Sequence, residues 1–259
     1  MLSGPVEVAT VFTQAQFDEY ARLSGDDNPI HVDPQFAAQT RFGRTVAHGM
    51  FLFSALQSAL AAQTAEPVRL RGQEFMFTAP TYTGDPLLLS LRPTAGSLVE
   101  EITDSAGNVT LSGVAHLGEP DAREPAPPEL MVSAGYKGLE VGMTASRTRS
   151  IGRQDVSDFL RLTRDRNPLF ATEPPELPPG LLAGMDSWVL GVDLPGRGTN
   201  WLKQQYTYHR SVAVPVEITS TVTITRIRPD KGLINLATRC STRDGTVSSG
   251  EALVLAVDT

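Results

Sequence analysis

The longest apolar segment of the chain lies at residues 49–63, where Met, Phe, Leu and Ala occupy most positions. A helix that is apolar on all sides has to be enclosed by other structure. Two short helices are expected before it. One covers residues 14–23, and the other begins at Asp33 and Pro34, because Asp is a good N-cap and Pro suits the first helical position.

Strand-like segments follow this helix and can form the sheet that encloses it. They are rich in apolar residues and Thr, and turns of Gly, Asp, Asn and Pro separate them, with SAGN expected at a hairpin tip. The expected strands are residues 73–77, 86–92, 98–103 and 109–117 in the first half, and 205–209, 217–226, 233–241 and 246–257 in the second. A buried helix followed by an antiparallel sheet, present twice, predicts an α+β fold.

The two halves also match in sequence. FDEYARLSGDDNPIH from Phe17 matches VSDFLRLTRDRNPLF from Val156, and AHGM at residues 47–50 matches LAGM at 182–185. The same elements in the same order indicate an internal duplication. EPDAREPAPPEL at residues 119–130 has the proline and charge content of a linker. We therefore expect one half at residues 1–119, a linker at 120–135 and the other half at 136–259.

Composition narrows the class of protein. The net charge of -7 argues against a nucleic-acid partner, which would need a basic surface. Cys240 is the single cysteine, which excludes an intramolecular disulfide and a cysteine-based zinc site and fits a reducing compartment. The first ten residues lack the pattern of a signal peptide, and the apolar segment is too short to span a bilayer. We expect a cytoplasmic enzyme that does not contact a membrane.

The segment SGDDNPIHVDP, residues 24–34, brings several polar groups together just before the apolar helix. On a helix, Asp26 and His31 would be about 140° apart and would not face one another. Pro29, however, disfavours a helical conformation for Asn28, which predicts a turning loop that can direct both side chains into one pocket. A carboxylate and an imidazole there can hold a water molecule and exchange protons with it.

Gly49 supplies a second part of the expected site. As the first residue of the apolar helix, it has an N–H without a partner in the helix, at the positive end of the helix dipole and unshielded by a side chain. It can bind an oxygen on which negative charge develops, such as that of a thioester. Asn28 could either orient Asp26 or contact the substrate.

The motif YARLSGDDNPIH, followed by FGRTVAHGM, resembles that of the MaoC-like (R)-specific enoyl-CoA hydratases and 3-hydroxyacyl thioester dehydratases, which have the hotdog fold. The resemblance implies a double hotdog, in which each half wraps an antiparallel sheet around a central helix. It also implies that Asp26 and His31 are the catalytic pair, Asn28 a supporting residue and Gly49 the oxyanion donor. His48 is expected to be structural.

The activity implied by this resemblance is the addition of water to trans-2-enoyl thioesters, or its removal from (R)-3-hydroxyacyl thioesters, in fatty acid or polyketide metabolism. Coenzyme A or an acyl carrier protein would carry the acyl group, and no cofactor or metal is expected. Arg41 and Arg44 could bind the phosphates of either carrier. Two double-hotdog chains could form a homodimer.

The second half departs from the motif at the position that matters for proton exchange. Asp165, Asn167 and Pro168 are retained, but Phe170 stands where His31 does. Phenylalanine cannot exchange a proton. We therefore expect one active site, in the first half.

The second half then serves as a scaffold and binds the acyl chain, with Leu182 and Trp188 expected to line an acyl channel. Two other functions stay open. A hotdog acyl thioesterase would share the fold but cleave the thioester, and the Asp-x-Asn-Pro-x-His loop argues against it. A non-catalytic acyl-thioester-binding protein is disfavoured by the intact pair in the first half.

Overall fold

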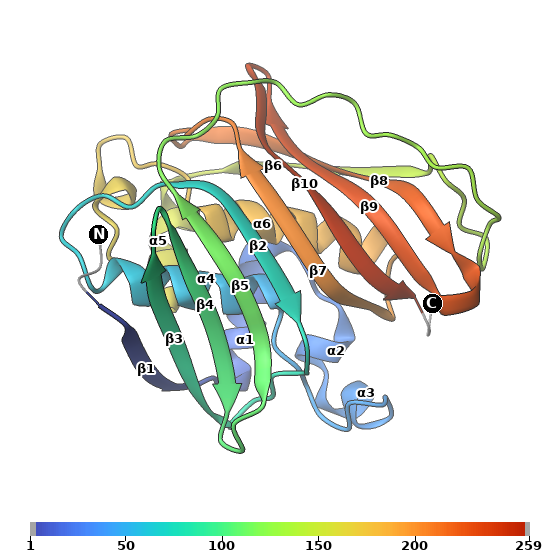
Figure 1. Cartoon of the computed structure of the whole chain (residues 1–259), viewed down its shortest axis with the longest axis horizontal. Coiled ribbons are helices and arrows are strands. Elements are labelled where there is room, and N and C mark those ends of the chain that lie inside the picture. Colours follow the sequence, from blue (N-terminus) through green and yellow to red (C-terminus); the bar gives the residue numbers. More distant parts are fainter. Residues whose placement is uncertain (1–3, 257–259) are drawn as a thin grey trace.

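The computed structural model describes residues 4–256, which form a ten-stranded antiparallel sheet with the main helices on one side (Figure 1). The strand order is β1-β3-β4-β5-β2-β7-β10-β9-β8-β6. Read from either edge to the centre, this order is the first, third, fourth, fifth and second strand of one half. The two halves are thus related by an approximate two-fold axis between β2 and β7.

The first half contains the expected helices and strands with small changes at their ends. It also contains two elements that the sequence did not predict, a strand at one edge of the sheet and a helical turn inside the expected loop. The elements are β1 (Val6–Val11), α1 (Gln14–Ser24), α2 (Pro29–Val32), α3 (Pro34–Ala38), α4 (Gly49–Ala61), β2 (Leu70–Phe77), β3 (Pro86–Thr94), β4 (Ser97–Asp104) and β5 (Val109–Leu117).

The second half repeats the series. Its elements are β6 (Thr144–Ile151), α5 (Arg153–Thr163), η1 (Pro168–Ala171), α6 (Pro179–Trp188), η2 (Val189–Asp193), β7 (Thr199–Tyr208), β8 (Val216–Arg228), η3 (Pro229–Lys231), β9 (Leu233–Thr242) and β10 (Gly245–Ala256). The match of AHGM with LAGM is wrong, because α6 already begins at Pro179 and Gly184 lies in its middle. Val257, the expected end of the last strand, lies outside the described residues.

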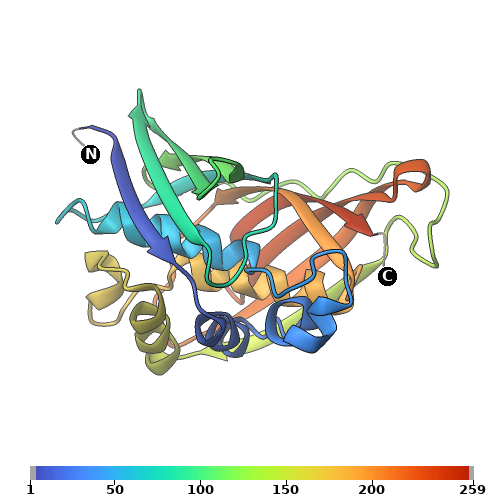
Figure 2. The ribbon, with the colours of Figure 1, turned by 90° about the horizontal axis from the view of Figure 1, so that it is seen from below.

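The central helices α4 and α6 lie side by side beneath the sheet, and α1 and α5 lie farther from it (Figure 2). Ten of the thirteen residues of α4 are buried, as its apolar sequence predicts. Small residues allow the close approach of the two helices: a Cβ added to Gly180 would lie 2.2 Å from Ser54 Oγ. The main hydrophobic core draws side chains from both halves.

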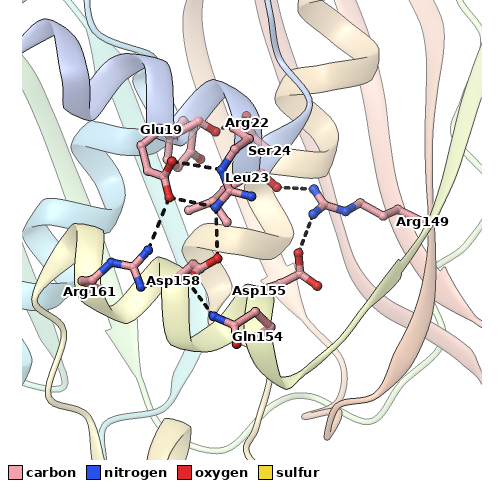
Figure 3. Close-up of polar contacts among 10 residues, drawn as sticks. Glu19, Arg22, Leu23, Ser24, Arg149, Gln154, Asp155, Asp158 and Arg161 are labelled. Atoms are coloured by element: carbon pink, nitrogen blue, oxygen red, sulfur yellow. Dashed lines mark hydrogen bonds and ion pairs between the residues drawn. The ribbon is translucent and has the colours of Figure 1, made fainter.

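Polar contacts join α1 to the second half at the point where α1 ends (Figure 3). Arg22 contacts Asp158 of α5 at 3.1 Å, an exposed pair of small energetic value. Arg149 of β6 is less exposed. It donates to the Leu23 carbonyl and to Asp155 Oδ1, the latter at 2.6 Å. This arginine therefore fixes the end of α1, from which the polar motif begins.

The halves are continuous through the sheet centre. β2 pairs antiparallel with β7, with Gly72 opposite Thr207 and Met76 opposite Lys203. The segment between β5 and β6 crosses the outer side of the second-half strands (Figure 1). The boundaries proposed at residues 119 and 135 lie in this segment and remain a prediction. None of the helices in residues 4–256 has the length and apolar character needed to cross a bilayer.

Candidate active site

The motif loop starts where α1 ends. Gly25 has a left-handed backbone with φ of 89°, and its N–H caps α1 by donating to the Ala21 carbonyl. Asn28 has a non-helical backbone (φ −55°, ψ 122°), as the following Pro29 predicts. The residues after it are not a loop, however, but the helical turn α2. Proline suits its first position, and Asn28 caps it by accepting from Ile30 N.

Asp26, His31 and His48 meet in one buried cluster, with one polar atom of each within 4.8 Å of the others. His31 Nδ1 lies 2.8 Å from the Val46 carbonyl, which can only accept, so this nitrogen carries the proton. In the neutral ring, His31 Nε2 is left with a free lone pair. His48 Nε2 donates to the Asp26 carbonyl at 3.0 Å, and its ring stacks on His31 at 3.8 Å. His48 thus supports both members of the pair.

The geometry of this cluster does not suit a metal ion. A metal lies in the plane of a coordinating imidazole, along the nitrogen lone pair. The His31 and His48 rings are stacked with planes only 29° apart, so their lone pairs cannot converge on one ion. Within residues 4–256, no other group of His, Cys, Asp or Glu side chains has metal-ligand spacing.

Burial shifts the two pKa values toward each other. Burial raises the pKa of Asp26, although the charge of His31 and a hydrogen bond from Ser187 act to lower it. Burial lowers the pKa of His31, although the charge of Asp26 acts to raise it. Two groups with converging pKa values can exchange the roles of acid and base at little energetic cost. Burial also holds the pKa of His48 well below its ordinary value, so His48 stays neutral.

The second half holds the motif loop from the other side. Ser187 Oγ, on α6, donates to Asp26 Oδ2 at 2.5 Å, and Asn28 Nδ2 donates to the Gly191 carbonyl at 3.3 Å. Gly191 lies so close that an added Cβ would be 2.9 Å from Asp26 Oδ1. Sequence reasoning missed Ser187 and Gly191, because they are more than 160 residues away and no local pattern marks them.

Gly49 is the first residue of α4, as expected, and its N–H has no partner within residues 4–256. It lines the same cavity as Asp26 and His31. The ring of Phe77 lies against it, since an added Cβ would be 2.6 Å from the ring. A larger residue at this position would therefore displace Phe77 as well as narrow the cavity.

The cavity has a volume of about 390 Å³ and is lined from both halves. Its second-half wall includes Leu190, Trp201 and Leu202. Leu182 and Trp188 are not among its lining residues. Leu182 is buried beside a smaller hollow near Phe170, and the Trp188 ring packs over Gly25.

The rim carries the two arginines that the sequence singled out. Arg41 lines the cavity, and its guanidinium lies 4.9 Å from the centre of the Phe42 ring. Arg44 lies 4.2 Å from the centre of the Tyr82 ring and donates to both oxygens of Asp85, at 2.9 and 2.7 Å. Arg44 is therefore paired with a carboxylate, whereas Arg41 contacts an aromatic ring.

The degenerate copy of the motif keeps its framework. Asn167 N donates to Asp165 Oδ1 at 2.8 Å, and Asn167 Nδ2 donates to the Val68 carbonyl at 2.6 Å, as Asn28 does to Gly191. Phe170, in place of the histidine, is buried. The residue that corresponds to Gly49 at the start of the helix is Pro179, which has no N–H. The copy thus lacks both the imidazole and the N–H at the helix start.

Comparison with known proteins agrees with the motif. Residues 4–114 match the family model of the MaoC like domain. An (R)-specific enoyl-CoA hydratase of Aeromonas caviae is 36% identical over 126 residues, which are 45% of this chain and 94% of that protein. A 3-hydroxybutyryl-CoA dehydratase of Methylorubrum extorquens is 35% identical over 136 residues, 49% of this chain and 86% of that protein.

Two solved structures align over nearly the whole chain. A MaoC-like dehydratase covers 98% of both chains with a TM-score of 0.76 and 14% identity. A conserved Mycobacterium tuberculosis protein described as having a double hotdog fold covers 98% of this chain and 96% of its own, with a TM-score of 0.73 and 12% identity. These likenesses show the fold, and the expected double hotdog is confirmed.

Proposed function

Because the chain belongs to the MaoC-like hydratase and dehydratase family, we propose that it adds water to trans-2-enoyl thioesters or removes it from (R)-3-hydroxyacyl thioesters. One observation carries this proposal. A buried carboxyl, an imidazole with a free ring nitrogen and a backbone N–H without a partner line the same cavity, from Asp26, His31 and Gly49. These are the groups that hydration of a conjugated thioester requires.

In the hydration direction, the thioester oxygen binds the Gly49 N–H at the positive end of α4. Negative charge develops on this oxygen, and the N–H and the helix dipole stabilise it. Water lies between Asp26 and His31. Its oxygen bonds to C3 as one of its protons passes to the pair, and the pair delivers one proton to C2, so that the pair ends with the number of protons with which it began. One water molecule is added in all, and dehydration is the same path in reverse.

The second half serves this reaction as a scaffold and as one wall of the substrate cavity. Ser187 and Gly191 restrict the position of the Asp26 carboxyl, and correct placement of reacting groups is a large part of catalysis. For the acyl chain, we propose an apolar wall of Leu190, Trp201 and Leu202. They replace Leu182 and Trp188, which the cavity does not reach.

Substitution of the pair tests the proposal. Asp26→Asn and His31→Gln keep the shape of each side chain but prevent proton transfer, and each should lower the hydration rate roughly a hundred- to ten-thousand-fold. Because both act on one water, the double variant should lose much less than the product of the single losses. Loss of enoyl-thioester absorbance measures the rate, and circular dichroism checks folding.

The same assays separate the other candidate functions. Release of free thiol without hydration would identify a thioesterase, and binding without either reaction would identify a non-catalytic acyl-binding protein. The hydrated product should have the R configuration at C3, which chiral chromatography determines. Turnover close to the wild-type rate in either single variant would exclude Asp26 and His31 as the catalytic pair.

A further inference from the structure

Two arginines at the rim of the cavity differ in whether a carboxylate pairs with them. Both Arg41 and Arg44 lie over an aromatic ring, at 4.9 and 4.2 Å from the ring centres. Arg44 is also held by a two-fold hydrogen bond to the Asp85 carboxylate. Arg41 is exposed, and no carboxylate within residues 4–256 pairs with it. Its positive charge is therefore available to a ligand.

The next cation near the motif loop is also neutralised. Arg197 Nη2 lies 3.1 Å from Asp27 Oδ1, close to the catalytic Asp26. Of the arginines around the cavity, Arg41 alone both lines it and lacks an acidic partner in the described part of the chain. Its charge is available on the cavity wall to a negatively charged arm that enters.

We propose that Arg41, with the Phe42 ring beside it, binds a phosphate group of the substrate's carrier arm, whereas Arg44 stabilises the rim. This inference rests on the proposed function, because it assumes a thioester substrate. A guanidinium presents several N–H donors in a fixed fork that matches phosphate oxygens. The guanidinium carbon lies 4.9 Å from the centre of the Phe42 ring, and no hydrogen bond within residues 4–256 occupies its N–H donors, which can therefore bind the phosphate.

Phosphate is shared by both carriers, since a phosphorylated pantetheine arm joins the thioester either to the adenosine of coenzyme A or to a carrier protein. The rim favours coenzyme A. Docking of an acidic carrier protein would need a complementary basic surface, but Arg44 and Arg197 are already paired with acids and the chain has a net charge of -7. A single free guanidinium with an adjacent ring suits a nucleotide.

The test compares carriers of increasing length. In Arg41→Gln, the KM for an enoyl-CoA thioester should rise about tenfold with kcat unchanged, as expected when an interaction equal in ground and transition states is lost. The KM for the N-acetylcysteamine thioester, which has no phosphate, should stay the same. In the matched variant Arg44→Gln, the ratio of the two KM values should stay at its wild-type value.

The 4′-phosphopantetheine thioester and an acyl carrier protein thioester locate the phosphate and identify the carrier. A wild-type preference for the coenzyme A thioester over the carrier protein thioester supports the choice of carrier, and the reverse preference overturns it. Equal changes in Arg41→Gln for substrates with and without phosphate, or no change for either, would overturn the phosphate site.

Equilibrium binding keeps this result apart from the proposed function. Calorimetry with free coenzyme A should give a Kd about tenfold higher in Arg41→Gln than in the wild type, whether or not any thioester is turned over. Weakened binding of coenzyme A together with no turnover would refute the hydratase and support the phosphate site. Turnover of the thioester together with unchanged binding of coenzyme A would support the hydratase and refute the phosphate site.

Discussion

At the scale of single residues, the Asp26 carboxyl is held between groups of both halves. Ser187 donates to one of its oxygens and the Asn28 N–H approaches the other, while the His48 ring fixes its backbone carbonyl. A carboxyl bound in this way keeps one orientation without reorganisation at the moment of reaction. The first half therefore contains the chemical groups, but the second half sets their geometry.

Gly191→Ala tests this dependence. The backbone of Gly191 does not have a positive φ, so alanine is compatible with it, but the new methyl would lie 2.9 Å from Asp26 Oδ1. Displacement of a reacting group by about 1 Å can lower a rate roughly a hundredfold. We expect kcat to fall by that order with little change in KM or melting temperature. Wild-type kcat in this variant would show that the contact does not position Asp26.

Glu100 gives a prediction on stability. This carboxyl of β4 is fully buried between Gln57 and Gln73, and burial raises its pKa from 4.5 to about 8. Between these values the folded state binds a proton that the unfolded state has released, so its contribution to stability is present below pH 4.5 and is lost as the pH rises to about 8.

Glu100→Gln removes this titration while it keeps the size of the side chain. The wild type should therefore lose stability relative to the variant from pH 5 to pH 8, by up to a few kcal/mol, since one pKa unit corresponds to about 1.4 kcal/mol. Urea denaturation at several pH values measures the difference. If the free energies of unfolding of the two proteins changed in parallel between pH 5 and pH 8, Glu100 would be ionised in the folded state over this range.

At the scale of elements, the sequence predicted most of those whose pattern is decided locally, although it missed the edge strand β1, which alternates as VEVATV. The predominantly apolar sequence of α4 and the apolar and Thr content of the sheet strands were sufficient for both types of element. Edge strand β6 was missed because its sequence, TASRTRSI, is mostly polar and exposed. The π-helical turn η2, which brings Gly191 to Asp26, depends on packing between halves rather than on local preference.

The crossing of α6 over α1 depends on a residue without a side chain. A Cβ at Gly184 would lie 2.9 Å from Ser24 Cβ and 3.2 Å from Tyr20 Oη. In an isolated helix, alanine would be more stable than glycine by about 1 kcal/mol. Here the overlap should reverse the sign, and Gly184→Ala should destabilise the fold by roughly 1–3 kcal/mol.

A double-mutant cycle identifies the cause. Ser24→Gly removes the methylene that the new methyl would meet, so Gly184→Ala should be less harmful in that background. Denaturant unfolding of the four proteins gives the coupling energy. Strict additivity of the two changes would place the origin of the destabilisation elsewhere than in this contact.

At the scale of the whole molecule, one continuous sheet and one main core unite the half with the intact motif and the half with its degenerate copy. The sequence predicted the loss of the imidazole at Phe170, because the motif could be aligned there. The loss of the N–H at the helix start, where Pro179 stands, could not be predicted, since the alignment placed the start of the helix five residues too late. Only the observed helix start reveals it.

Two variants test whether the second half is catalytic. Asp165→Asn should leave kcat/KM close to the wild-type value, in contrast to Asp26→Asn. In the Asp26→Asn background, Phe170→His should not restore hydration, because Pro179 has no N–H to bind the thioester oxygen. Hydration assays with purified, folded variants give the answer. Recovery of activity with Phe170→His would mean that another donor serves the second half.

The pairing of β2 with β7 within one polypeptide has a consequence for heredity. In an assembly of two identical chains, each mutation appears on both sides of the symmetry axis, so a change that destroys one active site also destroys the other. Here the two halves are different segments of one chain, and a mutation changes only one of them. The second half could therefore lose its histidine while the first half kept its own, and could acquire residues, such as Ser187 and Gly191, that contact only the site of the first half.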